Sequence, residues 1–171
     1  DDEPTARTLL PVFPYPAANP FMPYPAMTIT ATNQGLVAAS LTDGNEVTVC
    51  GNAPCLKDET GKINGIVFAA DAAAEVLDSH GICPDAIFTD LDGATDRFVE
   101  LNREGTIIVI HAHGDNMPLL KHWVPRFTGR VVGTTQAAPL PHVYNFGGFS
   151  DGDRAVFAAD ELGASHITLF G

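Results

Sequence analysis

The sequence predicts an α/β fold with a mostly parallel, Rossmann-like sheet and helices on both of its faces. From residue 46 onward, short apolar runs alternate with amphipathic patterns of helical period, as in βαβ units. Almost every apolar run is followed by small, acidic or polar residues, and the carboxyl ends of parallel strands are where such folds bind ligands. The length, 171 residues, is that of one domain. We therefore separate an N-terminal segment, residues 1–45, from an α/β domain, residues 46–171.

The N-terminal segment contains a stretch rich in proline and aromatic residues. Residues 11–25 hold six prolines, together with Phe13, Tyr15, Phe21 and Tyr24. Proline lacks the backbone N–H and restricts the residue before it, which excludes a helix or a central strand here. The aromatic residues favour an extended segment pinned to a surface, such as a subunit contact in a homo-oligomer. The alternative is a free linker, although linkers are more often rich in glycine and serine.

The elements of the α/β domain alternate along the chain. Apolar runs predict strands at residues 47–50, 65–69, 86–89, 106–111, 130–133 and 166–170, with 142–146 a candidate for one more. Helical patterns occupy residues 72–80, 96–104, 117–123 and 151–162. Gly81 and Gly163 stand where helices prefer a C-terminal glycine. Ser150 and Asp153 match a capping box, which explains both residues and starts the last helix at residue 151.

Charge and cysteine content argue against several classes of protein. The formal net charge is −12, from 21 acidic and 9 basic residues, whereas non-specific nucleic-acid binding needs a basic surface. No apolar run approaches the roughly 20 residues of a membrane span, and no signal peptide is evident. Three cysteines without a C-x-x-C pair disfavour a disulfide scaffold or a structural zinc site, so we expect a reducing cytoplasm. The chain starts at Asp1 rather than Met, so we expect further residues upstream.

The most informative residues are two aspartates at the end of an apolar run, Asp90 and Asp92. If residues 87–92 form a strand, alternation makes both side chains point the same way. Two like charges about 4 Å apart repel by about 4 kcal/mol at an effective dielectric constant of 20. At the carboxyl edge of a parallel sheet, a divalent cation is the best explanation for such a pair.

Further carboxylates follow other strands. Asp71 follows the second strand and is either part of the same site or a cap for the helix after it. Asp151 begins the last helix, and the capping box leaves it without a local role, which favours a metal or phosphate site. With few basic residues, a phosphate ligand would have to be neutralised by metal ions, backbone amides and a small number of cations.

Small residues and one arginine supply the candidate phosphate contacts. The loop after the first strand is either a tight turn or a place where backbone amides approach phosphate; its residues are Gly51, Asn52, Ala53 and Pro54. Gly147 and Gly148 precede the last helix and would permit close approach of an anion. Arg154, in the first turn of that helix, reaches phosphate or lies on the solvated surface.

The spacing His111-x-His113-x-Asp115 can be read in two ways. Alternation in a continued strand would place all three on one side, as in a zinc hydrolase. However, Asn116 stands where the final histidine of such a motif belongs, and Gly114 is expected to break the strand. We therefore expect Asp115 to join the carboxylates, with one histidine contacting ligand and the other supporting it.

Taken together, these motifs resemble those of the archaeal MptE-like 6-hydroxymethyl-7,8-dihydropterin diphosphokinases over residues 47–171. The matching segments are G-N-A-P-C-L (51–56), A-A-D-A-A (69–73), P-D-A-I-F-T-D-L-D-G (84–93), H-A-H-G-D-N (111–116), T-T-Q (134–136) and N-F-G-G-F-S-D-G-D-R-A (145–155). Their order, spacing and number make the resemblance specific. The series A-D, P-D and D-x-D also looks like that of thiamine pyrophosphokinases, which implies a catalytic domain of that type.

The resemblance implies Mg²⁺-dependent transfer of diphosphate from ATP to the hydroxymethyl group of a reduced pterin, with AMP leaving, in tetrahydromethanopterin or folate biosynthesis. It implies that five carboxylates surround the metal and the phosphates: Asp71, Asp90, Asp92, Asp115 and Asp151. Three of them are the expected Mg²⁺ ligands: Asp90, Asp92 and Asp151. The residues expected to bind ATP are Gly51, Asn52, Ala53, Pro54, His113, Gln136, Gly147, Gly148, Ser150 and Arg154.

Two other activities remain open on the sequence. A thiamine-type pyrophosphokinase would share the chemistry and differ in the acceptor pocket. A motility-associated glycosyltransferase of the same superfamily would use a nucleotide-sugar, although its flanking domains would not fit this length. Cys55 stands where the family often has serine, which leaves a hydroxyl contact in doubt.

Overall fold

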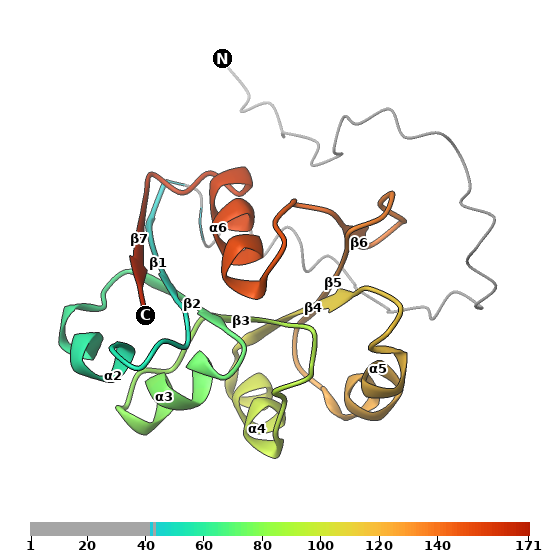
Figure 1. Ribbon diagram of the computed structural model, residues 1–171, viewed down its shortest axis with the longest axis horizontal. Helices are drawn as coiled ribbons and strands as arrows, with labels where there is room; N and C mark the ends of the chain where they lie inside the picture. Colours follow the sequence, from blue (N-terminus) through green and yellow to red (C-terminus); the bar gives the residue numbers. More distant parts are fainter. Residues whose placement is uncertain (1–41, 43) are drawn as a thin grey trace, which may run out of the picture.

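A parallel sheet of seven strands forms the centre of the protein (Figure 1). The computed structural model describes residue 42 and residues 44–171. The strands are β1 (Glu46–Cys50), β2 (Ile66–Ala70), β3 (Ala86–Thr89), β4 (Ile107–Ala112), β5 (Val131–Thr135), β6 (Val143–Tyr144) and β7 (His166–Phe170). Their order in the sheet is β6-β5-β4-β3-β2-β1-β7, and every neighbouring pair is parallel. The expected α/β fold is confirmed.

The chain builds this sheet in one direction and then returns. Strands β1 to β6 follow one another across the sheet, and the connecting helices are α2 (Leu56–Glu59), α3 (Ala73–Ser79), α4 (Asp96–Glu104) and α5 (Met117–Trp123). Helix α6 (Asp151–Glu161) then carries the chain back to β7, beside β1. Because parallel crossovers are right-handed, reversing the direction puts α6 on the opposite face. Figure 1 shows α2 to α5 below the sheet and α6 above it.

The two faces of the sheet carry separate hydrophobic cores. On one face, fully buried side chains from the helices, such as Leu56, Leu77 and Phe98, pack against the sheet. On the other face, α6 buries Ala155, Ala158 and Ala159 against strand residues. Small alanine side chains let this helix lie close to the sheet. As a result, the first turn of α6 is held next to the carboxyl end of β2, where a Cβ added to Gly152 would come within 4.0 Å of Ala70.

The predicted elements agree with the structure to within two residues at their ends. Strand 86–89 and helices 96–104 and 117–123 have the predicted bounds, and the candidate strand at 142–146 is present as the short β6. The four-residue helix α2 was not predicted, because one turn is too short to show a helical period. The proline-rich stretch 11–25 lies outside the described residues. Among the residues that the structure describes, no helix is long and apolar enough to cross a membrane.

The strand predicted at 86–89 does not continue to Asp92, as the alternation of Asp90 and Asp92 would have required. Strand β3 ends at Thr89, so residues 87–92 do not form a continuous strand. Leu91 has a φ of +76°, a left-handed conformation that few residues other than glycine adopt, and its side chain is fully buried. The backbone therefore turns sharply after β3, and strand alternation cannot be what brings Asp90 and Asp92 together.

Substitution of Asn102 with alanine should destabilise this fold. Its buried side chain donates to the carbonyls of Thr106 (3.1 Å) and Arg130 (2.9 Å) and accepts from the N–H of Gly129 (2.7 Å), which joins α4 to the starts of β4 and β5. Leaving these buried groups unpaired should lower the free energy of unfolding by about 2–4 kcal/mol. Urea denaturation measures this loss. The exposed neighbour Arg103→Ala is the control and should change stability by less than about 0.5 kcal/mol.

Candidate active site

Asp71 is fixed in place by the strand next to it. It lies directly after β2 in a left-handed conformation with a φ of +46°. Its Oδ1 accepts a hydrogen bond from the Thr89 hydroxyl (2.6 Å), and the same hydroxyl oxygen accepts from the N–H of Leu91 (2.8 Å). Helix α3 has Ala72 at its N-cap and no side-chain cap. The capping alternative for Asp71 is therefore not what the structure shows.

Gly93 gives the Asp71 carboxylate its space. A Cβ atom added at Gly93 would overlap the Oδ2 atom of Asp71. This close approach brings the loop after β3 against the turn after β2. The last residue of the D-L-D-G segment is therefore a glycine for a steric reason that depends on Asp71.

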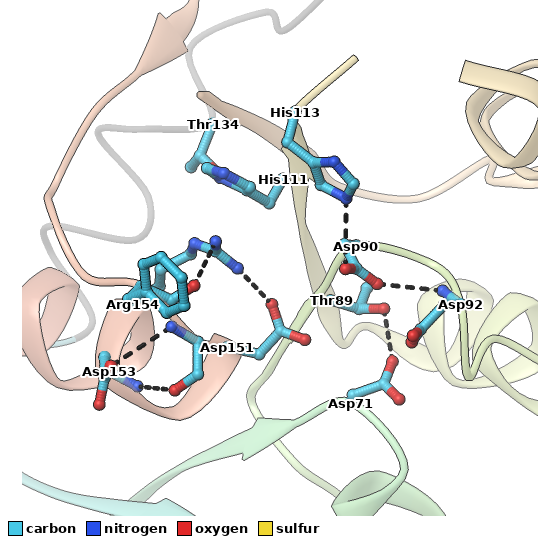
Figure 2. Close-up of polar contacts among 12 residues, drawn as sticks. Asp71, Thr89, Asp90, Asp92, His111, His113, Thr134, Asp151, Asp153 and Arg154 are labelled. Carbon is cyan, nitrogen blue, oxygen red and sulfur yellow. Dashed lines mark hydrogen bonds and ion pairs between the residues drawn. The ribbon is translucent and has the colours of Figure 1, made fainter. Parts of the chain in front are cut away.

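Asp90 and Asp92 lie together because of a turn. The Asp92 N–H donates to Oδ1 of Asp90 (3.2 Å), and Oδ2 of Asp90 lies 3.3 Å from Nε2 of His113 (Figure 2). Burial raises the pKa of Asp92, and the neighbouring carboxylates of Asp90 and Asp71 raise it further. The juxtaposition expected from the sequence is therefore present, although a turn rather than a strand produces it.

The start of α6 brings a fourth carboxylate to this edge. Ser150 caps the helix in the predicted capping box with Asp153. Asp151 is free of that cap and forms an ion pair with Arg154, whose Nη1 lies 2.9 Å from its Oδ1. Burial raises the pKa of Asp151 to about 6; Asp90 and Asp71 also raise it, while Arg154 opposes the shift. Four carboxylates, those of Asp71, Asp90, Asp92 and Asp151, thus share one electrostatic environment; we call them the acidic cluster.

Arg154 points inward rather than into solvent. Its side chain is 13% exposed, and its Nη2 donates to the carbonyl of Phe149 (2.6 Å). The solvated-surface alternative for Arg154 is therefore wrong. The structure also gives Asp151 a local partner, which the sequence analysis did not anticipate; the available signal was the spacing of three residues between Asp151 and Arg154 on the predicted helix.

The glycines of the candidate phosphate loops have packing roles in this structure. Gly148 has a φ of +85°, and a Cβ there would lie 2.7 Å from the backbone nitrogen of Arg154. A Cβ at Gly51 would lie 3.0 Å from the carbonyl oxygen of Gly171, next to the end of β7. Both glycines therefore permit close contact between protein segments. Phosphate binding by residues 51–54 and 147–148 stays a prediction.

The histidine segment divides into separate roles. His111, in β4, is buried, and its Nδ1 lies 3.1 Å from the hydroxyl oxygen of Thr134. His113 follows the strand and contacts Asp90. Strand β4 ends at Ala112, and Gly114 has a φ of +92°, so Asp115 lies exposed in the next loop. The three side chains do not share one strand face, as the expected break at Gly114 implied.

Three buried polar residues that support the site escaped the sequence analysis: Thr89, Asn116 and Thr134. Asn116 donates to the carbonyls of Asp90 (2.8 Å) and His111 (2.7 Å) and accepts from the N–H of His113 (3.2 Å). It therefore joins the loop after β3 to the end of β4. Its place in the H-A-H-G-D-N segment was the available signal, but a role through backbone carbonyls has no sequence signature.

The donor set of the acidic cluster suits a hard divalent cation. Carboxylate oxygens are the ligands that Mg²⁺ prefers. Burial raises the pKa values of Asp92 and Asp151, and the charges of Asp90 and Asp71 raise them further; a cation would offset this second effect. Within residues 42 and 44–171, no three histidine, cysteine or acidic side chains converge closely enough to enclose a metal. Magnesium retains several waters and commonly takes one or two carboxylates, so the cluster fits it without such convergence.

The fold and the acidic cluster define a Rossmann-like α/β protein whose candidate site lies at the carboxyl edge of a parallel sheet. A family model described as "6-hydroxymethylpterin diphosphokinase MptE-like" matches residues 27–171. The chain belongs to the MptE-like family, as the resemblance predicted. The match begins inside the segment 1–45.

Curated relatives carry one name. Proteins named 6-hydroxymethyl-7,8-dihydropterin pyrophosphokinase from Methanothermobacter thermautotrophicus, Pyrococcus furiosus and Methanocaldococcus jannaschii are 42%, 46% and 39% identical to this chain. The aligned regions cover 72%, 74% and 75% of the chain but 55%, 54% and 58% of those proteins. The chain thus spans little more than half the length of the curated relatives it matches.

Loss of the Thr89 hydroxyl should destabilise the acidic cluster. Thr89→Val keeps the shape of the buried side chain but removes both the donor to Asp71 and the acceptor for the Leu91 N–H. We expect the free energy of unfolding to fall by about 1–3 kcal/mol in urea denaturation. Thr89→Ser retains the hydroxyl and should recover most of that loss. Equal losses for valine and serine would show that packing, rather than hydrogen bonding, makes Thr89 important.

Stability without metal should depend on pH through Asp151. A carboxyl group whose folded pKa is raised binds more protons in the folded state, so its contribution is present below the unfolded pKa near 3.8 and is lost as the pH rises through about 6. We compare the free energies of unfolding of wild type and Asp151→Asn in EDTA. The wild-type value minus the Asp151→Asn value should fall by about 2–3 kcal/mol between pH 4 and pH 7. The control is Asp160→Asn, at the exposed other end of α6. Its difference from wild type in free energy of unfolding should not change over this pH range.

Proposed function

We propose that this protein transfers diphosphate from ATP to 6-hydroxymethyl-7,8-dihydropterin in a Mg²⁺-dependent reaction, giving AMP and the pterin diphosphate. The acidic cluster beside the inward-pointing Arg154 is the observation that carries the proposal, because diphosphate transfer needs bound metal and positive charge at the same edge. The names of the three relatives support the choice of substrate. The reaction belongs to tetrahydromethanopterin or folate biosynthesis, and residues 46–171 form the catalytic domain.

The acidic cluster has the chemistry to hold the metal. Asp90, Asp92 and Asp151 would bind Mg²⁺, directly or through water, and bound Mg²⁺ would neutralise charge on the phosphates. Asp71 lies beside them, and its Oδ1 already accepts a hydrogen bond from Thr89. Its charge makes the electrostatic potential of the cluster more negative. These residues repel one another when ionised, and this repulsion favours binding of Mg²⁺ together with ATP.

The remaining contacts hold the phosphates. Arg154 contacts the acidic cluster through Asp151 and would pair with ATP phosphate when Asp151 turns to the metal. In the loops at 51–54 and 147–148, the backbone amides of Asn52, Ala53 and Gly148 would add neutral donors, because the N–H groups of Gly51 and Gly147 already donate to Phe170 and Asn145. Ser150, His113 and Gln136 belong to the same edge and complete the proposed ATP contacts.

The reaction itself asks little covalent help of the protein. The hydroxymethyl oxygen of the pterin attacks the β-phosphorus of ATP, the bond between that phosphorus and the α–β bridging oxygen breaks, and AMP leaves with the bridging oxygen. In-line placement of the alcohol supplies most of the catalysis in such reactions. A carboxylate, Asp71 or Asp115, or a histidine would accept the proton of the alcohol.

An assay of Asp92→Asn tests the proposed function. Removing one negative charge from the acidic cluster should lower AMP release from ATP, Mg²⁺ and hydroxymethyl-dihydropterin by at least about 100-fold, the loss expected for a group that helps to neutralise the transferred phosphates. Asp160→Asn, on the exposed end of α6, should retain wild-type activity. Near-wild-type pterin diphosphate formation by Asp92→Asn would rule out its metal role.

The acceptor is tested separately by thermal shift. The pterin with Mg·ATP should raise the melting temperature beyond Mg·ATP alone, because only ligands that bind the folded state stabilise it. Stabilisation by thiamine in place of the pterin would favour a thiamine-type pyrophosphokinase. Stabilisation by a CMP-sugar, with no effect of ATP, would favour a glycosyltransferase.

A further inference from the structure

Two buried nitrogen atoms beside the acidic cluster have no hydrogen-bond partner among the described residues. They are Nε2 of His111 and Nε of Arg154. His111 is 3% exposed. Unpaired buried polar atoms are rare because each costs free energy, so two in one place need an explanation. Figure 2 shows the Arg154 guanidinium between the His111 ring and Asp151.

The other nitrogen of His111 fixes the tautomer of the ring. The Thr134 hydroxyl donates its single hydrogen to the carbonyl of Ile110 (3.2 Å). In this arrangement the oxygen accepts from Nδ1 of His111, 3.1 Å away, which assigns the ring proton to Nδ1. Burial, Arg154 and His113 lower the pKa of His111 to about 4, against smaller opposing effects of a side-chain hydrogen bond with Gln136, which favours the charged ring, and of the Asp90 charge. The ring is neutral at physiological pH, and Nε2 holds an unshared electron pair.

The two unpaired atoms are therefore complementary. Nε2 of His111 is an acceptor without a donor, and Nε–H of Arg154 is a donor without an acceptor. The other two nitrogens of the guanidinium are already engaged by Asp151 and by the carbonyl of Phe149. His113 cannot take this role, because its Nε2 faces Asp90.

We infer that His111 is a positioning residue for Arg154, its Nε2 accepting the Nε–H of the guanidinium through one water. This bond completes a chain from Ile110 through Thr134 and His111 to Arg154. Resting on the proposed function, it has a consequence for catalysis. When Mg²⁺ draws Asp151 away, Arg154 loses its carboxylate partner, and His111 keeps the cation directed at the arriving phosphates. A neutral acceptor does this without competing for the positive charge.

The tautomer can be observed without any substrate. In the ¹⁵N-labelled chain, long-range ¹H–¹⁵N spectra at pH 7 should show His111 protonated at Nδ1 and bare at Nε2. Arg154→Ala should then shift the Nε2 resonance toward that of a free electron pair. An Nε2–H tautomer, a charged ring, or an Nε2 resonance that does not respond to Arg154→Ala would overturn the inference. This result does not depend on whether the protein is a diphosphokinase.

A matched pair of variants tests the consequence for phosphate binding. His111→Gln places an amide near the Nε2 position but gives up the Thr134 contact, whereas His111→Asn keeps an amide near Nδ1 and has nothing at Nε2. Calorimetric titration with inorganic tripolyphosphate and Mg²⁺ should show the asparagine variant binding about tenfold more weakly than wild type and the glutamine variant within about threefold. The reverse order would assign His111 a merely structural role through Thr134. If Arg154→Ala binds tripolyphosphate as wild type does, the phosphate role in the proposed function fails, while the tautomer result still stands.

Discussion

Mutual repulsion among four carboxylates is the constraint on which this site depends. Asp71, Asp90 and Asp92 follow two neighbouring strands, and Asp151 begins α6. Burial raises the pKa values of Asp92 and Asp151, and the charges of Asp90 and Asp71 raise them further. The protein holds them in place with neutral donors and one cation: the Thr89 hydroxyl, the Asp92 amide and Arg154. Such an arrangement favours binding of a divalent cation, because the cation would reduce the repulsion among all four carboxylates.

The backbone around the cluster carries the conformational cost. Leu91 and Asp71 both adopt left-handed conformations, and Gly93 leaves room for a carboxylate that any side chain would displace. The buried Leu91 side chain and the Thr89 and Asn116 hydrogen bonds hold this backbone in place. Strained backbone of this kind is concentrated at functional sites, where the surrounding fold compensates for it. Here the compensation comes from a sheet whose central strands, β2 to β5, are buried.

Much of the fold could be predicted from the sequence, because buried parallel strands and amphipathic helices leave periodic patterns. Asp71, Asp90 and Asp92 were predictable for the same reason, because each follows a strand and parallel strands end at one edge. Asp151 was predicted because the capping box at the start of α6 does not use it. The contacts were not. The turn at Leu91 and the packing of Gly148 against α6 depend on backbone geometry and on close approach between segments. Asn116 and Thr134 act through carbonyls and a ring nitrogen, which no residue pattern encodes.

The central claim is that the acidic cluster binds Mg²⁺ and ATP as a unit. Calorimetric titration of the wild-type chain at pH 7 with ATP, first in EDTA and then in Mg²⁺, tests it most directly. Four carboxylates should repel free ATP, so binding should be weak in EDTA and stronger by at least about tenfold in Mg²⁺, a difference of about 1.4 kcal/mol. Equal affinity with and without Mg²⁺ would contradict the account, because phosphate would then be held by protein cations and amides alone.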